Sequence, residues 1–93
     1  MRFFKRSNQR VVTGTVRDAN DDVVALIGEW GSAPRAQVLA ELRAGSREYS
    51  VQAPDGMLIA VEIKTGSTDQ FIWVSWTPGH NNLDDLSREI RIS

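Results

Sequence analysis

A single segment with helical spacing separates two regions that have the composition of β-strands, and this order constrains the fold most. Three apolar residues of "GSAPRAQVLAELRAG" recur on one helix face: Val38, Leu39 and Leu42. Pro34 suits the first turn, where its missing N–H has no partner, and Gly45 suits the left-handed residue after the last turn. We therefore expect a helix from about Pro34 to Ala44.

The region before this helix has the composition of a β-hairpin. Residues 11–17 are rich in valine and threonine, "DANDD" at 18–22 is typical of a turn, and "VVALIGEW" resumes the β-rich pattern. The turn also matches a calcium loop at four positions, namely Asp18, Asn20, Asp22 and Glu29. Its sixth position carries Val23 instead of the required glycine, and strands flank it in place of helices. The hairpin is therefore the favoured interpretation.

The region after the helix contains three further apolar runs, "REYSVQA", "GMLIAVEIK" and "FIWVSW", separated by turn-forming residues. Three consecutive antiparallel strands are the simplest arrangement. In the middle run, alternation directs one set of side chains toward the core: Met57, Ile59, Val61 and Ile63.

These elements predict a single small α+β domain of order β-β-α-β-β-β, with one helix packed on a twisted, mostly antiparallel sheet. The 93 residues can bury one modest core, and the lack of cysteine excludes disulfides and thiolate metal sites. We expect residues 1–10 to form a basic arm and residues 11–93 to form the domain. The side chains expected in the core are Val38, Leu42, Val51, Ile59, Val61, Ile72 and Val74.

The run "FIWVSW" is apolar on both faces, with Phe71 and Trp73 on one face and Ile72, Val74 and Trp76 on the other. Either a curved sheet or the N-terminal arm covers the second face, or an aromatic patch stays open for a partner. The candidate partner-binding residues are Phe71, Trp73 and Trp76.

Charge is distributed unevenly along the chain. The net charge is −1, but the first ten residues carry +4, which leaves seven basic and twelve acidic residues, or −5, in the rest. An arm of this kind can contact nucleic acid or an anionic membrane, or it can be a frayed terminus or a first strand against the acidic body. The candidate nucleic-acid contacts are Arg2, Lys5, Arg6 and Arg10. The chain has no run that could span a bilayer, so we expect no membrane partner and a cytoplasmic location.

Residues 77–87, "TPGHNNLDDLS", contain the only histidine of the chain. His80, Asp84 and Asp85 could supply ligands to a metal. The start of a short helix accounts for more of the segment, because Asn82 can cap the helix while Asp84 and Asp85 lie in its first turn. We therefore assign Asn82, Asp84 and Asp85 a structural role and expect no metal or cofactor.

No catalytic constellation is present in the sequence. There is no cysteine nucleophile, no G-x-S-x-G elbow and no glycine-rich phosphate loop. We therefore expect a binding or interaction module that is not an enzyme, with an unknown protein partner or self-association. The alternative is a nucleic-acid-binding accessory protein that uses the basic arm.

Five segments, "VRDANDDVVAL", "RAQVLAELRAG", "EYSV", "DGMLIAVEI" and "NNLDDL", occur in an order that resembles the domain-of-unknown-function 3892 family of small bacterial and phage proteins. The likeness extends from about Val11 to Leu86, and its most specific element is Asn81 to Asp84 after an aromatic strand. The resemblance implies a small α+β fold and supplies no activity, ligand or catalytic residue.

Overall fold

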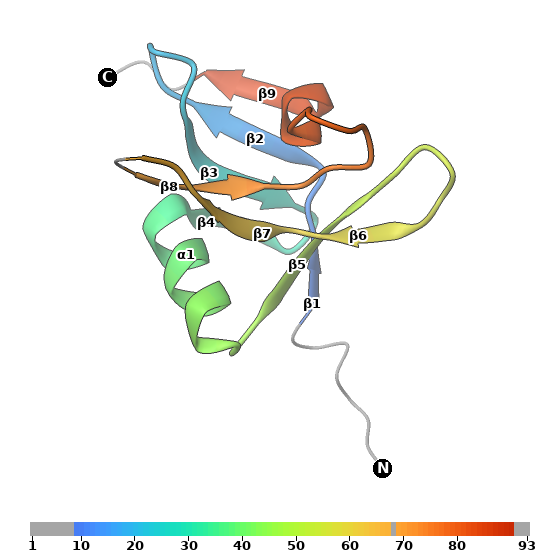
Figure 1. The fold of residues 1–93 in the computed structure, drawn as a ribbon, viewed down its shortest axis with the longest axis horizontal. Coiled ribbons are helices and arrows are strands. Elements are labelled where there is room, and N and C mark those ends of the chain that lie inside the picture. Colours follow the sequence, from blue (N-terminus) through green and yellow to red (C-terminus); the bar gives the residue numbers. More distant parts are fainter. Residues whose placement is uncertain (1–8, 68, 91–93) are drawn as a thin grey trace.

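The computed structural model describes residues 9–67 and 69–90, and these residues form a small α+β domain (Figure 1). Four of the six strand pairings are antiparallel. In chain order the elements are β1 (Gln9–Val11), β2 (Gly14–Arg17), β3 (Val23–Gly28), β4 (Gly31–Pro34), α1 (Arg35–Ala44), β5 (Glu48–Gln52), β6 (Leu58–Ala60), β7 (Glu62–Thr65), β8 (Gln70–Trp73), a 3₁₀-helix (Asn82–Asp85) and β9 (Ser87–Ile90).

The expected hairpin is present as β2 and β3, which lie in the middle of a four-stranded sheet of order β4-β3-β2-β9. Its turn is held by Asp18, whose Oδ1 accepts hydrogen bonds from the backbone N–H groups of Asn20 and Asp22. Asp21 has φ 64°, a left-handed conformation that aspartate tolerates better than most residues.

The expected helix is present as α1, one residue shorter at its start than the sequence suggests. Pro34 precedes the first turn, and Gly45 follows the last turn with φ 69°. The helix buries Val38 and Leu39, whereas Leu42 is only partly buried beside the core. The expectation of a fully buried Leu42 is therefore wrong, because this residue lies at the edge of the buried face.

The single middle strand expected after the helix is two strands, β6 and β7, separated by Val61. β6 pairs with β5 in a three-stranded sheet of order β1-β5-β6, and β7 pairs with β8 in a separate two-stranded ribbon. Val61 is 3% exposed, and its N–H donates to the carbonyl of Tyr49 at 2.8 Å. The chain therefore passes from one sheet to the next at a buried residue.

Met57 does not face the core as expected, since it is 60% exposed. It precedes β6 in the turn of the β5–β6 hairpin, where its carbonyl accepts a hydrogen bond from Ala53. In β6 the side chains still alternate between exposed and partly buried, but the core does not extend as far as this turn. Ile59, also expected to be buried, is partly buried against the core.

Two strands were not expected, β4 and β9, whereas a first strand against the body was one of the alternatives for the N-terminal arm. β1 pairs in parallel with β5, and it includes Gln9 and Arg10, which the sequence assigned to the basic arm. β9 pairs in parallel with β2. Both pairings join segments far apart in the sequence, and local periodicity carries no information on such contacts.

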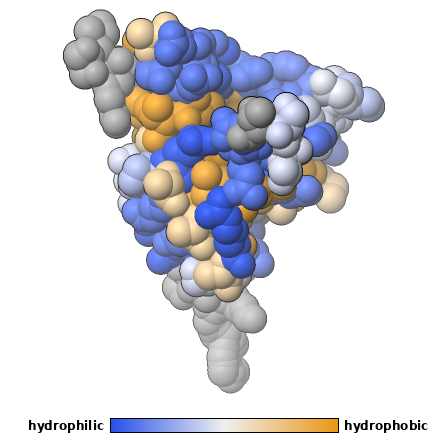
Figure 2. Space-filling view, turned by 60° about the vertical axis from the view of Figure 1, so that its left-hand side comes forward, coloured by the Kyte–Doolittle hydropathy of each residue, from blue (hydrophilic) through white to orange (hydrophobic). Residues whose placement is uncertain are grey.

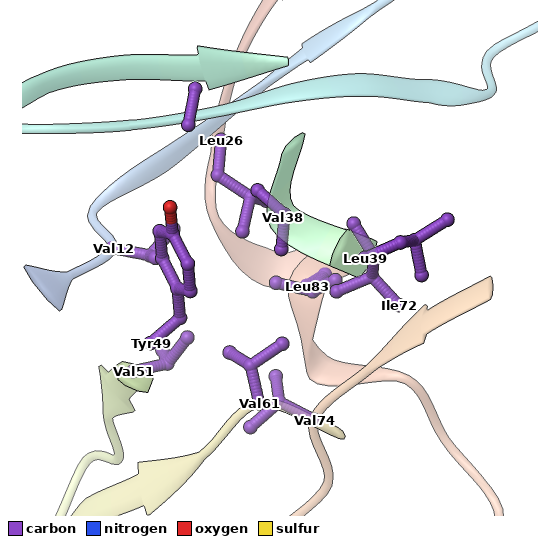
Figure 3. Packing of buried hydrophobic residues seen from close by; sticks show 11 residues of the cluster. Val12, Leu26, Val38, Leu39, Tyr49, Val51, Val61, Ile72, Val74 and Leu83 are labelled. Atoms are coloured by element: carbon purple, nitrogen blue, oxygen red, sulfur yellow. The ribbon is translucent and has the colours of Figure 1, made fainter. Parts of the chain in front are cut away.

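The core gathers side chains from the sheets, α1 and the 3₁₀-helix (Figure 3). Five of the residues expected there are buried: Val38, Val51, Val61, Ile72 and Val74. Tyr49, which was not expected in the core, and Leu83 are each 0% exposed. None of the described helices combines the length and the apolar character required to cross a membrane.

Candidate functional site

The β7–β8 ribbon has an inner and an outer face. Ile63 pairs with Ile72 on the inner face, where Ile72 is buried and Ile63 packs beside the core. The pairs Glu62–Trp73 and Lys64–Phe71 share the other side, because directly opposed residues point to the same face. We call the side formed by Glu62, Lys64, Phe71 and Trp73 the outer ribbon face.

Two aromatic side chains of the outer ribbon face contact each other. Phe71 and Trp73 are both half-buried, and their rings meet edge to face with centroids 6.0 Å apart. The Nζ of Lys64 lies 4.1 Å from the centre of the Trp73 ring, a cation–π contact. These contacts place the two rings next to each other on a face that is partly exposed.

Trp76, the third candidate partner-binding residue, has different surroundings. It packs against the buried core, and its backbone N–H donates to Asn82 Oδ1 at 2.8 Å. The structure therefore brings Phe71 and Trp73 together and places Trp76 with the core.

A cleft of about 620 Å³ adjoins this face. It lies among the β2–β3 turn, the start of α1, β8 and the 3₁₀-helix, and Phe71 and Ile72 form part of its wall. Figure 2 shows hydrophobic surface between hydrophilic regions on one side of the molecule. The charged residues of the cleft are Arg17, Asp18, Asp21, Asp22, Arg35, Asp69 and Asp84.

The cleft is acidic, since five aspartates face two arginines. Arg17 is committed to the fold: its side chain is 4% exposed, and it donates to Thr15 Oγ1, to the carbonyls of Asp21 and Leu83, and to Asp84 Oδ1 at 2.9 Å. The burial of this arginine was not expected from the sequence. The sequence feature that could have indicated its burial is the position of a charged residue at the end of a valine-rich strand.

Arg35 is the second arginine of the cleft. It donates to the carbonyl of Gln70 and lies 3.7 Å from the carboxylate of Asp69. These contacts attach the first residue of α1 to the start of β8. Both arginines therefore have carboxylate partners, and Asp21 is paired with Arg88 from β9 at 2.6 Å. The carboxylates of Asp18 and Asp22 remain to give the cleft its negative charge.

Asn81 completes the edge of β8 that faces away from β7. Its Nδ2 donates to the carbonyl of Ile72 at 3.0 Å, and its Oδ1 accepts from the N–H of Val74 at 3.2 Å. The side-chain amide thus takes the place that a peptide group of another strand would occupy.

The helix cap lies one residue earlier than the sequence suggested. Asn81, not Asn82, is the N-cap of the 3₁₀-helix, and its Oδ1 accepts from the N–H of Leu83. Asn82 is 1% exposed and binds the preceding loop, accepting from the N–H groups of Trp76 and Thr77. Asparagine can cap a helix at either position. Because the side chain of Asn82 is bound to Trp76 and Thr77, Asn81 is the residue that caps this helix.

Asp84 and Asp85 lie in the first turn of this helix, where the sequence placed them. Asp84 forms an ion pair with Arg17. Asp85 accepts a hydrogen bond from Asn82 Nδ2 at 2.8 Å, and it also contacts His80 Nε2 at 3.2 Å. The bond from Asn82, followed by that from His80, lowers the pKa of Asp85. Residues 9–67 and 69–90 contain no group of three or more histidine and carboxylate side chains placed to hold a metal ion.

Of the four candidate nucleic-acid contacts, the structure describes Arg10; Arg2, Lys5 and Arg6 lie outside the described residues. The guanidinium of Arg10 lies 4.7 Å from the centre of the Trp30 ring, and its Nη1 donates to the Tyr49 hydroxyl at 3.3 Å. These contacts attach β1 to the body of the domain.

The hydroxyl of Tyr49 in turn donates a hydrogen bond to Glu41 Oε1, and Arg47 donates to Glu41 Oε2 at 3.3 Å. The bond from Tyr49 is the main reason why the pKa of Glu41 is lowered. Burial, followed by the bond to Glu41, raises the pKa of Tyr49. This network joins β1, β5 and α1.

Comparisons of the chain with protein-family models, with curated proteins and with solved structures give no match. The resemblance drawn from the segments quoted above therefore stays a prediction.

Proposed function

We propose that this chain is a non-catalytic binding module whose contact surface is the outer ribbon face together with the adjoining acidic cleft. The proposal rests on one observation. Phe71 and Trp73 form an ordered, half-buried aromatic pair on the side of β8 opposite to buried Ile72.

Aromatic pairs of this kind are suited to contact with a partner. Tryptophan contributes a large apolar area with few rotatable bonds, and it is enriched among the residues that dominate binding energies. Trp73 is also held by Lys64 and Phe71, so that little side-chain entropy remains to be lost on binding.

The cleft indicates the chemistry of the partner. Its five aspartates and two arginines leave an excess of negative charge next to Phe71. A segment with basic and aromatic or aliphatic side chains would meet carboxylates in the cleft and rings on the outer ribbon face. We therefore propose a basic protein segment as the partner, and this charge disfavours nucleic acid at the same surface.

His80 contacts Asp85 on the surface, and the catalytic motifs considered above are missing from the sequence. Both observations support a role without catalysis. A cytoplasmic location is part of the same proposal.

Titration of ¹⁵N-labelled protein with short synthetic peptides tests the function. One peptide combines lysine, arginine and phenylalanine, a second replaces the cations with glutamate, and a third replaces phenylalanine with serine. We expect the first to bind most tightly and to shift the amide signals of β7, β8 and the start of α1.

The matched variants are Trp73→Ser in the contact surface and Met57→Ser at a distant exposed position. Loss of a central tryptophan costs about 2 kcal/mol of binding energy or more, so Trp73→Ser should weaken the first peptide by about 30-fold, and Met57→Ser should leave it unchanged. Equal effects of the two variants, or signal shifts centred on the β5–β6 hairpin, would contradict the proposal.

A further inference from the structure

We infer that residues 1–8 of a second copy of this chain dock on the outer ribbon face and its cleft, so that the protein associates with itself through its basic arm. The inference rests on the proposed function and names the partner. It follows from three properties of the chain: complementary charge, complementary side chains and the position of β1.

The charges of the two surfaces are opposite and similar in size. Residues 1–8, "MRFFKRSN", contain three cations, Arg2, Lys5 and Arg6, and no acidic residue. The cleft has five aspartates and two arginines, and Arg88 beside it pairs with Asp21, which leaves an excess of two negative charges. Four of these aspartates are exposed: Asp21, Asp22, Asp69 and Asp84.

The apolar side chains also match. Phe3 and Phe4 lie between the cations of the arm, and the outer ribbon face presents Phe71 and Trp73 beside the cleft. Ring-to-ring contacts of this kind add to the energy gained from the area they bury. A segment that combines cations with aromatic rings therefore suits a surface that combines carboxylates with aromatic rings.

The position of β1 favours docking between copies over docking within one chain. Gln9 is the first residue of β1, and it pairs with Glu48, which follows the C-terminal end of α1. The cleft lies at the other end of this helix, where Arg35 is part of its lining. A helix of ten residues is about 15 Å long. Figure 1 likewise places β1 and the β2–β3 turn at opposite ends of the molecule.

Eight extended residues reach at most about 29 Å. To enter its own cleft, residues 1–8 would have to span about the length of α1, which uses more than half of this reach. The cleft of a second copy carries no such constraint. Because arm and cleft are different surfaces, the contact is heterologous and gives either rings or open chains, unless two copies exchange arms reciprocally.

Sedimentation velocity of the full chain tests the inference. At low salt we expect the mean mass to rise above that of the monomer as protein concentration rises, and to return toward it at about 0.5 M salt, where charges are screened beyond about 4 Å. The full-length variant Arg2→Gln/Lys5→Gln/Arg6→Gln should remain monomeric. This variant should still bind a synthetic peptide of residues 1–8, and it should not bind the same peptide with its three cations replaced by glutamine.

Substitutions in the cleft give the second arm of the test. Asp22→Asn/Asp69→Asn removes two negative charges from the cleft, and Glu29→Gln/Glu89→Gln removes two from exposed positions outside its lining. An exposed ion pair contributes about 0.2–1 kcal/mol, so the loss of two should raise the dissociation constant about 2- to 30-fold, and the control should change it little.

A wild-type chain that is monomeric at all concentrations in low salt would overturn the inference, as would association of the triple glutamine variant at wild-type strength. If the chain stays monomeric while the unrelated basic peptide still binds at Trp73, the self-association is refuted and the proposed function stands. If neither peptide binds, both fail.

Discussion

The hydroxyl of Tyr49 donates a hydrogen bond to the carboxylate of Glu41, and this bond attaches β5 to α1. Tyr49 is fully buried, packs edge to face on Trp30 with centroids 5.8 Å apart, and also accepts a hydrogen bond from Arg10. One side chain thus connects α1 with β1, β5 and the turn between β3 and β4.

Tyr49→Phe should lower the free energy of unfolding by about 1–3 kcal/mol at pH 7, because a buried hydrogen bond to a charged group is lost. The folded-state pKa of Glu41 is below its usual value of 4.5, so its contribution to stability is present above that value and is lost as pH falls through the folded-state pKa. Urea unfolding from pH 7 to pH 3 measures this. The difference between wild type and Tyr49→Phe should shrink toward the acid end, and a difference that is constant or grows would contradict the assignment.

Gly28→Ala should destabilise the fold by about 1–3 kcal/mol. A Cβ at this position would collide with Trp30 Nε1 and with the carbonyl of Val11, which are joined by a hydrogen bond of 2.7 Å. Gly66→Ala is the matched control, because a Cβ there meets its neighbours at the ordinary distance of 3.5 Å. Equal urea midpoints for the two variants would show that the Trp30 contact has little effect on stability.

Asn82→Ala should cost about 2–4 kcal/mol, since the backbone N–H groups of Trp76 and Thr77 both lose their acceptor. Asn20→Ala, in an exposed turn, should change the free energy of unfolding by less than about 0.5 kcal/mol. Thermal and urea unfolding of the two variants provide the comparison. A cost for Asn82→Ala no larger than that of a simple cap, about 1 kcal/mol, would favour the role first assigned to it.

Local pattern was sufficient for part of this fold. The helical spacing around Val38 and the turn at residues 18–22 depend on neighbours in the sequence, and both elements were predicted correctly in place and type. The same holds for the inward direction of Ile72 and Val74. The parallel pairings of β1 with β5 and of β9 with β2 join residues about 40 and 70 positions apart, and no local signal encodes them.

The candidate site likewise has features that the local sequence predicts and features that depend on distant residues. The alternation of "FIWVSW" places Phe71 and Trp73 on one face, but it gives no information on the cleft, which α1 and the β2–β3 turn form only in the folded chain. The buried Arg17 is a second case. Two of its four partners, Leu83 and Asp84, lie 66 and 67 positions away in the sequence, so the charge could be recognised as buried only after the chain had been assembled.

The central claim is that the outer ribbon face is a contact surface and not a part of the core, and the costs of two tryptophan substitutions test it most directly. Trp76 packs against the core, whereas Trp73 contacts Phe71 and Lys64 on the outer ribbon face. Urea unfolding should show that Trp73→Ser lowers the free energy of unfolding by about 1 kcal/mol or less, and that Trp76→Ser lowers it by about 2–4 kcal/mol. A loss for Trp73→Ser as large as that for Trp76→Ser would contradict the account.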